Sequence, residues 1–314
     1  MVHSRWRVKS PAMELWIWVS LGAATAQTLR FMLQKHLKST RLSTAGATFS
    51  RFIYSAPLVA VFFTIYLNVS GQSLPQTNAR FWVFALGGGL AQILATLCVV
   101  ALFAQRNFAV GITFKKTEVL QTAIVGLVVL GEALTRAGTF AIMLGFVALL
   151  LLSDPPEGTF TGPRWRRFFN RAAGLGLLSG VLFGFSAVGY RGASLGLEGG
   201  NVALRAGFTL LVATTSQSSA MALWLLIRDR AQILAVFRAW RVAAFVGVTS
   251  MIGSYLWFVA FTLQTAAYVK AIGQFELILS VAASVLFFKE KITGRELAGI
   301  ALLLISILIL VLFL

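Results

Sequence analysis

The chain carries ten apolar runs that are long enough, or nearly long enough, to cross a lipid bilayer. A membrane-spanning helix needs roughly 20 mostly apolar residues. Charged residues make up only 12% of the sequence, whereas soluble domains carry about 25%. Together these features predict an all-α membrane protein. The expected spans are Leu15–Leu33, Ala45–Leu67, Phe81–Ala104, Ala109–Leu130, Gly138–Leu152, Ala172–Tyr190, Phe208–Ile227, Val242–Leu263, Ala266–Phe288 and Leu297–Leu314.

A basic segment rich in Pro and Gly divides the spans into two sets of five. Residues 154–171 contain three Pro and four Arg residues. Proline ends helices, and charged side chains are costly within lipid. We therefore expect a first five-helix repeat at residues 1–153, a linker loop at 154–171 and a second repeat at 172–314.

The two halves resemble each other at a constant offset. A shift of 158 residues aligns Trp82 with Trp240 and Glu118 with Glu276, and the register holds from the third span of each half to the start of the fifth. Because each half has an odd number of helices, the second copy must sit upside down in the membrane. The expected fold is ten transmembrane helices arranged as two inverted five-helix repeats, as in many secondary transporters.

Two corresponding segments resemble a known family. Residues Gly111–Thr135 and Val269–Thr293 each carry a glutamate within the apolar run and end in "GEALT" and "KEKIT", which hold a second one. They look like the paired signature of the drug/metabolite transporter superfamily, in its ten-helix EamA-type branch. The resemblance implies a basket of helices around a central cavity, alternating access, and export or exchange of small molecules. The superfamily handles amino acids, nucleotide-sugars, sugar phosphates and drugs.

Charged side chains inside the spans are the strongest candidates for function, because an intramembrane charge usually faces a partner or a wet cavity. Glu118 lies nine residues after Ala109 and Glu276 nine residues after Ala267, each about 13–14 Å from the helix start, so both should sit near the bilayer midplane. There they could couple transport to protons or position a substrate. In the alternative account Glu118 only pairs with Lys115, three residues away on the same helix face. The basic residues within spans are Arg30, Arg51, Lys115, Lys116 and Lys270.

Polar stripes mark the helices that carry the two glutamates. One stripe holds Lys115, Glu118 and Thr122. The residues 158 positions after Glu118 and Thr122 are Glu276 and Ser280, which form the corresponding stripe in the second half. Such stripes suit a central cavity, although they would also suit hydrogen bonds between helices. The remaining substrate-binding candidates are Lys116, Lys270, Gln274, Arg30, Gln27, Gln92, Tyr190, Tyr255 and Trp257.

The basic residues also suggest the charge of the substrate. In the sugar-phosphate and nucleotide-sugar branches of the superfamily, lysines on the corresponding helices bind the anionic end of the substrate, so Lys115, Lys116 and Lys270 imply a carboxylate or phosphate. Basic groups in the spans outnumber acids five to two. In the competing account, Lys115 pairs with Glu118 while Lys116 and Lys270 extend to the membrane interfaces.

We therefore expect a secondary active transporter, an exporter or exchanger, of a small polar metabolite that bears an anionic group, such as an amino acid or a phosphorylated metabolite. The alternatives are a flippase of lipid-linked sugar or phospholipid and a proton-coupled drug exporter. A cationic-drug exporter is less favoured because the first span has only Glu14 at its edge and Arg30 inside it.

Other classes of function lack the residues they need. The spans hold no cluster of Asp, His or Cys, and Cys98 is the single cysteine, so we expect no enzyme activity, no cofactor and no metal. The net charge of +17 comes from Arg and Lys beside the spans, which indicates membrane lipids as partners and no nucleic acid. A monomer is compatible with the sequence.

Charge asymmetry predicts the orientation in the membrane. Loops that follow odd-numbered spans carry more Lys and Arg than the opposite side. The positive-inside rule places them in the cytoplasm, so both termini would be extracytoplasmic. Arg5, Arg7 and Lys9 near the N-terminus oppose this assignment. We expect a multi-pass protein of the bacterial inner membrane.

Overall fold

The computed structural model describes residues 11–40, 42–102, 115–152, 171–279 and 294–313. Among these residues none forms a strand, and Gln76 and Glu198 make one isolated antiparallel bridge. The expected all-α architecture is confirmed. The helices are α1 (Pro11–Thr40), α2 (Thr44–Ser70), α3 (Ala79–Leu102), α5 (Glu118–Leu130), α6 (Arg136–Leu152), α7 (Arg171–Leu195), α8 (Val202–Arg228), α9 (Arg230–Arg238), α10 (Trp240–Leu263), α11 (Ala266–Gly273) and α13 (Gly294–Phe313).

Five helices in the described ranges are both long and apolar enough to cross a membrane: α2, α3, α7, α8 and α10. Shorter apolar helices lie at Glu118–Leu130, Arg136–Ala148 and Leu297–Leu310. Large apolar side chains such as Val128 and Ile227 are more than two-thirds exposed, which suits a surface that contacts lipid. The chain is an integral, multi-pass membrane protein, as the sequence predicts, while the full set of ten spans stays a prediction.

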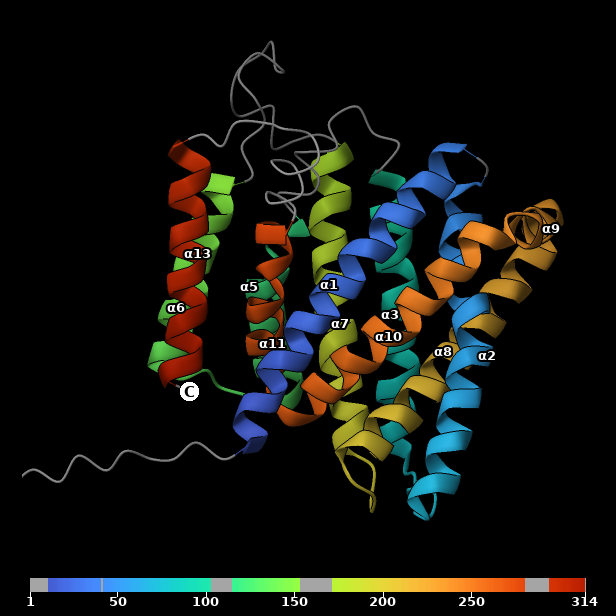
Figure 1. Cartoon of the computed structure of the whole chain (residues 1–314), viewed down its shortest axis with the longest axis horizontal. Helices are drawn as coiled ribbons and strands as arrows, with labels where there is room; N and C mark the ends of the chain where they lie inside the picture. Colours follow the sequence, from blue (N-terminus) through green and yellow to red (C-terminus); the bar gives the residue numbers. More distant parts are fainter. Residues whose placement is uncertain (1–10, 41, 103–114, 153–170, 280–293, 314) are drawn as a thin grey trace, which may run out of the picture.

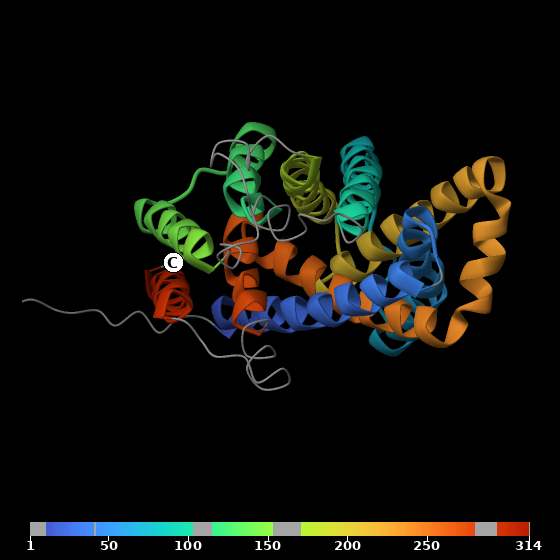
Figure 2. The ribbon, with the colours of Figure 1, turned by 90° about the horizontal axis from the view of Figure 1, so that it is seen from above.

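The helices form a bundle in which partners come from opposite halves of the chain. α6 and α13 lie side by side at one edge, and α9 lies at the opposite edge (Figures 1 and 2). Between these edges, α3 packs along α7, and α1 packs along α10. The start of α1 and the end of α13 lie at the same end of the bundle (Figure 1).

Local sequence signals set several helix ends. The Ser43 side chain accepts a hydrogen bond from the backbone N–H of Gly46 and caps α2, and Asn201 caps α8 in the same way. Such caps satisfy backbone donors that lack a partner in the first turn. Gly131 ends α5 with φ 71°, a left-handed conformation that glycine adopts without steric cost.

Glycines bring α3 and α7 into close contact. A Cβ atom added to Gly189 would lie 2.9 Å from the Cα of Gly88 and 3.0 Å from the carbonyl oxygen of Phe84. The backbones can approach this closely only because neither glycine has a side chain, as is common between membrane helices. Gly87, by contrast, meets no atom within 4 Å and faces outward.

The two spans that carry the glutamates are interrupted, and this corrects the expectation of continuous helices. α11 ends at Gly273, and Gln274 forms a turn in which its N–H donates to the carbonyl of Ala271 at 3.1 Å. The missing side chain of Gly273 leaves room for the ring of Trp257 against the backbone. In the first half a turn at residues 116–117 precedes α5. Residues 109–114 of that expected span lie outside the described residues.

A short helix, α9, occupies the connection between α8 and α10, where the sequence predicts a loop. Its Val236 is buried, whereas Arg230 and Arg238 are exposed. This segregation of apolar and charged side chains explains why a short basic segment folds as a helix at the edge of the bundle.

Candidate functional site

Five charged side chains are buried together near the start of α5 and the end of α11. We call them the charge cluster: Lys115, Lys116, Glu118, Lys270 and Glu276. Each residue is no more than 9% exposed. Because burial of an unpaired charge costs several kcal/mol, their mutual contacts decide whether this arrangement is tolerable.

The contacts in the charge cluster link the two halves of the chain. Lys270 Nζ lies 2.5 Å from Glu118 Oε1, and Lys116 forms an ion pair with Glu276. Lys115 Nζ reaches both carboxylates, at 3.5 Å from Glu118 Oε2 and 3.9 Å from Glu276 Oε1. Each glutamate therefore pairs with a lysine of the opposite half, and Lys115 is shared between them.

These contacts settle the alternatives that the sequence leaves open for the lysines. The pairing of Lys115 with Glu118 is confirmed. The extension of Lys116 and Lys270 to the membrane interfaces is wrong, because both are buried and paired with a carboxylate. Lys116 is consequently not an uncompensated charge. The sequence places no base three or four residues from Glu276, but Lys115 and Lys116, just before α5, supply two.

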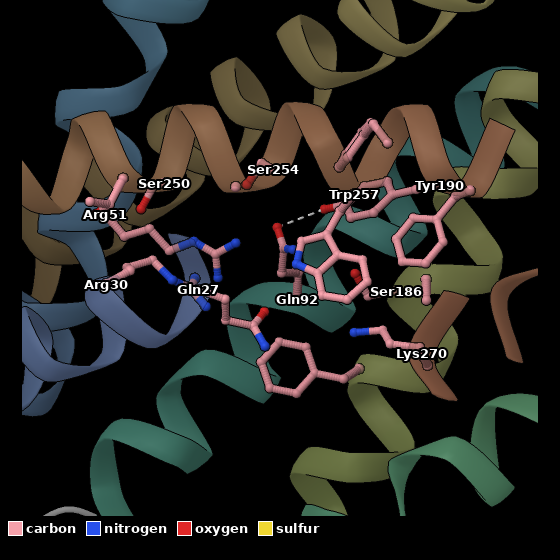
Figure 3. A pocket seen from close by; sticks show the side chains of 16 residues that line it. Gln27, Arg30, Arg51, Gln92, Ser186, Tyr190, Ser250, Ser254, Trp257 and Lys270 are labelled. Atoms are coloured by element: carbon pink, nitrogen blue, oxygen red, sulfur yellow. Dashed lines mark hydrogen bonds between the residues drawn. The ribbon is translucent and has the colours of Figure 1, made fainter. Parts of the chain in front are cut away.

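A central cavity lies next to the charge cluster and is enclosed by α1, α2, α3, α7, α10 and α11 (Figure 3). Lys270 belongs to both, and Gln27, which lines the cavity, donates from Nε2 to Glu276 Oε2 at 3.1 Å. The described residues that line the cavity are Gln27, Arg30, Arg51, Gln92, Phe183, Ser186, Ala187, Tyr190, Thr249, Ser250, Gly253, Ser254, Trp257, Phe258, Phe261 and Lys270.

One wall of the cavity is held by a hydrogen-bond network across three helices. The Tyr190 hydroxyl donates to Gln92 Oε1 at 3.0 Å (Figure 3). Gln217 Nε2 on α8 contacts the same oxygen at 2.9 Å, the Tyr190 hydroxyl at 3.0 Å and the carbonyl of Gly89 at 2.9 Å. Such satisfied buried networks fix the positions of their side chains, so this wall is preorganised.

Two arginines form the opposite end of the cavity. Arg30 and Arg51 are 3% and 4% exposed and point into the cavity from α1 and α2 (Figure 3). Arg51 Nη1 donates to Thr96 Oγ1 at 2.9 Å, and the Arg30 guanidinium lies 4.4 Å from the ring centroid of Phe31. Among the described residues, no carboxylate lies within ion-pairing distance of either guanidinium.

The structure brings most of the sequence candidates to these two places. The cavity holds Gln27, Arg30, Gln92, Tyr190, Trp257 and Lys270, and the charge cluster holds Lys115, Lys116, Glu118, Lys270 and Glu276. Thr122 lies behind the cluster, where its hydroxyl donates to the carbonyl of Glu118 at 2.7 Å. Gln274 and Lys116 line a second, mostly apolar cavity. Ser280 lies outside the described residues.

Tyr255 does not line the central cavity, which corrects its assignment. On α10 the cavity side is occupied by Ser250, Ser254, Trp257 and Phe261, positions that share a face at helical spacing. Tyr255 falls on another face of α10, where its ring packs on Phe62 of α2 at a centroid distance of 5.0 Å.

Several cavity residues are not among the substrate-binding candidates of the sequence. Arg51 is detectable as a charge within an apolar span, although the sequence does not indicate which cavity it faces. Ser186, Ser250 and Ser254 carry no such signal, because a serine in a membrane helix commonly bonds to its own backbone. Only the rotation of α7 and α10 about their own axes, which decides the face that each turns to the cavity, identifies them as lining residues.

Comparison with known proteins gives a family for the second half and a fold for the whole chain. Residues 170–312 match the model of the EamA-like transporter family. No curated protein matches the chain. Among solved structures 28 chains match, and one described as "Crystal structure of protein" aligns with a TM-score of 0.63 at 15% identity. The alignment covers 93% of this chain and 99% of that chain, so the two share a fold.

Proposed function

We propose, from the match of residues 170–312 to the EamA-like transporter family, that this chain belongs to that family within the drug/metabolite transporter superfamily and is a secondary active transporter. Its substrate is a small polar metabolite that bears an anionic group, and transport proceeds by alternating access around the central cavity. The loops that follow odd-numbered spans face the cytoplasm of a bacterial cell, and the chain acts as an exporter or exchanger in the inner membrane.

The central cavity is the observation that carries this proposal. It is lined by helices from both halves of the chain, and its buried surface combines amides, hydroxyls, aromatic rings and basic groups. Ligand sites typically join an apolar wall with a few polar groups that orient the ligand. A polar cavity between two halves of a membrane bundle is also the geometry that alternating access requires.

The proposal includes an inverted repeat, and helix packing supports it. The third helix of the first half, α3, packs on the first helix of the second half, α7. The reciprocal pair, α1 and α10, packs in the same way. The turns at Lys116 and Gln274 also fall at positions related by the 158-residue shift. A two-fold axis in the membrane plane accounts for all three correspondences.

In the proposed mechanism, the charge cluster couples the cavity to the rest of the bundle. Lys270 lines the cavity and pairs with Glu118, while Gln27 lines the cavity and bonds to Glu276. A substrate that contacts Lys270 therefore changes the surroundings of Glu118, and one that contacts Gln27 changes those of Glu276. The coupling role assigned to Glu118 and Glu276 rests on this connection.

Flux through proteoliposomes tests the proposed function. We expect labelled carboxylates or phosphorylated metabolites to move faster into vesicles with protein than into protein-free vesicles. Ser254→Trp should abolish the flux because it fills the cavity, whereas Glu198→Gln, an exposed position, should leave it unchanged. Equal flux with and without protein for every solute would refute transport, and movement of fluorescent lipid analogues alone would indicate a flippase.

A further inference from the structure

We propose that Arg30, Arg51 and Ser250 form an anion subsite at one end of the central cavity, and that the transported molecule carries a net negative charge. This inference rests on the proposed function and narrows it. The substrate has a carboxylate or phosphate group at the arginine end and an apolar or planar body that lies against Trp257. Zwitterionic amino acids and cations do not fit this cavity.

The balance of buried charge supports the subsite. The structure buries five basic and two acidic side chains in the described part of the spans. Both glutamates are engaged by the lysines of the charge cluster, which leaves that cluster with one excess positive charge. Arg30 and Arg51 add two more. Buried cations without a counter-ion are unfavourable, and an anion beside them removes the imbalance.

Unpartnered polar atoms point to the same place. Within the described residues, Arg30 Nη1, Ser250 Oγ and Trp257 Nε1 are buried without a hydrogen-bond partner, and all three residues line the central cavity. Each of these atoms can donate a hydrogen bond. A guanidinium matches the two oxygens of a carboxylate or phosphate, and its charged donors bind such groups strongly.

The composition of the cavity wall argues against positively charged substrates. None of the described lining residues is an Asp or Glu. The nearest carboxylates, Glu118 and Glu276, already face lysines. An ammonium group would lose its hydration shell in the cavity, and the two arginines would repel it. The face of the Trp257 ring, which could attract a cation, already has Lys270 Nζ 4.9 Å from its centroid. A net anion avoids both costs.

Aromatic side chains line the part of the cavity beside the arginine end. Trp257 and Phe261 stack with their ring centroids 5.7 Å apart and an interplanar angle of 14°. Phe258 packs on Tyr190 at a centroid distance of 4.2 Å. These rings offer a flat apolar surface beside the polar arginine end (Figure 3), so the substrate combines a charged head with a body that stacks on rings.

Five small probes that share a phenyl ring test the charge requirement. Phenyl phosphate and phenylacetate are anionic, phenylacetamide is neutral, phenylalanine is zwitterionic and phenethylamine is cationic at neutral pH. We expect saturable quenching of tryptophan fluorescence by the two anions in purified wild-type protein. The neutral amide should bind at least about tenfold more weakly, as loss of a charge-assisted hydrogen bond implies. The ratio of the dissociation constants of phenyl phosphate and phenylacetate identifies the preferred head group.

Variants locate the subsite. Arg30→Gln and Arg51→Gln should each weaken phenyl phosphate binding roughly tenfold or more, while Arg30→Lys should retain part of the affinity. Arg80→Gln is the matched control, because Arg80 lies exposed at the start of α3. Trp257→Phe keeps a ring but removes the hydrogen-bond donor. A several-fold loss of phenyl phosphate affinity is expected in this variant even if the arginine variants fail to fold, and it is measured by equilibrium dialysis because the substitution removes the tryptophan that lines the cavity.

Three outcomes would overturn the anion subsite. They are wild-type affinity in both arginine variants, tighter binding of phenylalanine or phenethylamine than of the anions, and no saturable binding of either anion at about 10 mM, the weak end of measurable affinities. Flux of a neutral or cationic solute that survives Arg30→Gln would refute the subsite but leave transport intact. Anion binding without any solute flux would refute transport instead.

Discussion

Glu118→Gln is the substitution that should disturb the charge cluster most. Glu118 is 4% exposed, lies 2.5 Å from Lys270 Nζ and 3.5 Å from Lys115 Nζ, and its amide analogue keeps the shape but loses the charge. Glu276 would then be the single carboxylate of a cluster that keeps three lysines. Removal of one partner from a buried ion pair costs about 3–5 kcal/mol. We therefore expect the free energy of unfolding to fall by about 3 kcal/mol and solute flux to stop.

A second substitution separates the loss of stability from the loss of function. In the double variant Glu118→Gln/Lys270→Gln two amides replace the ion pair, so no uncompensated charge is created at this contact. We expect it to recover most of the lost stability, with a coupling energy of about 1–3 kcal/mol, as found for residues in direct contact. Flux should remain absent, because neither the carboxylate nor the cavity-lining ammonium is restored.

The assays are unfolding in mixed micelles and flux in proteoliposomes. Helix content followed by circular dichroism during titration with a denaturing detergent reports stability, and flux is normalised to the amount of inserted protein. Glu198→Gln serves as the control for loss of a carboxylate on the surface. Wild-type stability and wild-type flux in Glu118→Gln would refute the reasoning and reduce Glu118 to a packing residue.

Three further predictions concern packing, a second ion pair and topology. Gly189→Ala should lower the free energy of unfolding by about 1–3 kcal/mol, because its Cβ would lie 2.9 Å from Gly88, while Gly87→Ala should be neutral in the same measurement. Arg191→Met should cost about 3 kcal/mol, since it leaves the carboxylate of Glu132, 2.5 Å away and 18% exposed, unpaired; equal unfolding midpoints would contradict this. A reporter fused to the C-terminus should give an extracytoplasmic signal, and a cytoplasmic signal would reverse the proposed orientation.

The sequence predicts those features of the fold that depend on local composition. Apolar runs identify the helices because lipid requires each backbone group to bond within its own helix. The pair of Lys115 and Glu118 follows from their spacing of three residues. The turn at Gln274 is not visible in the sequence, because the contact that accompanies it, between Gly273 and the ring of Trp257, joins two different helices.

The candidate site could be predicted only in part for the same reason. Buried charges such as Arg30 and Arg51 stand out in apolar spans, so the sequence identifies them. Their shared cavity depends on the rotation of α1 against α2, which no local pattern records. The sequence likewise finds Lys116 and Glu276 but not their pairing, since the two residues are 160 positions apart.

The pairing pattern in the charge cluster constrains how the two halves can move. Glu118 of the first half pairs with Lys270 of the second, and Glu276 of the second half pairs with Lys116 of the first. Separating the halves here would expose four charges without partners, at a cost of several kcal/mol for each buried ion. In the alternating access proposed above, the cluster therefore stays closed as a pivot while the helices around it tilt. Lys115, within 3.9 Å of both carboxylates, can keep each glutamate neutralised through small changes in distance, so the cluster can hold the halves together while the cavity opens to either face.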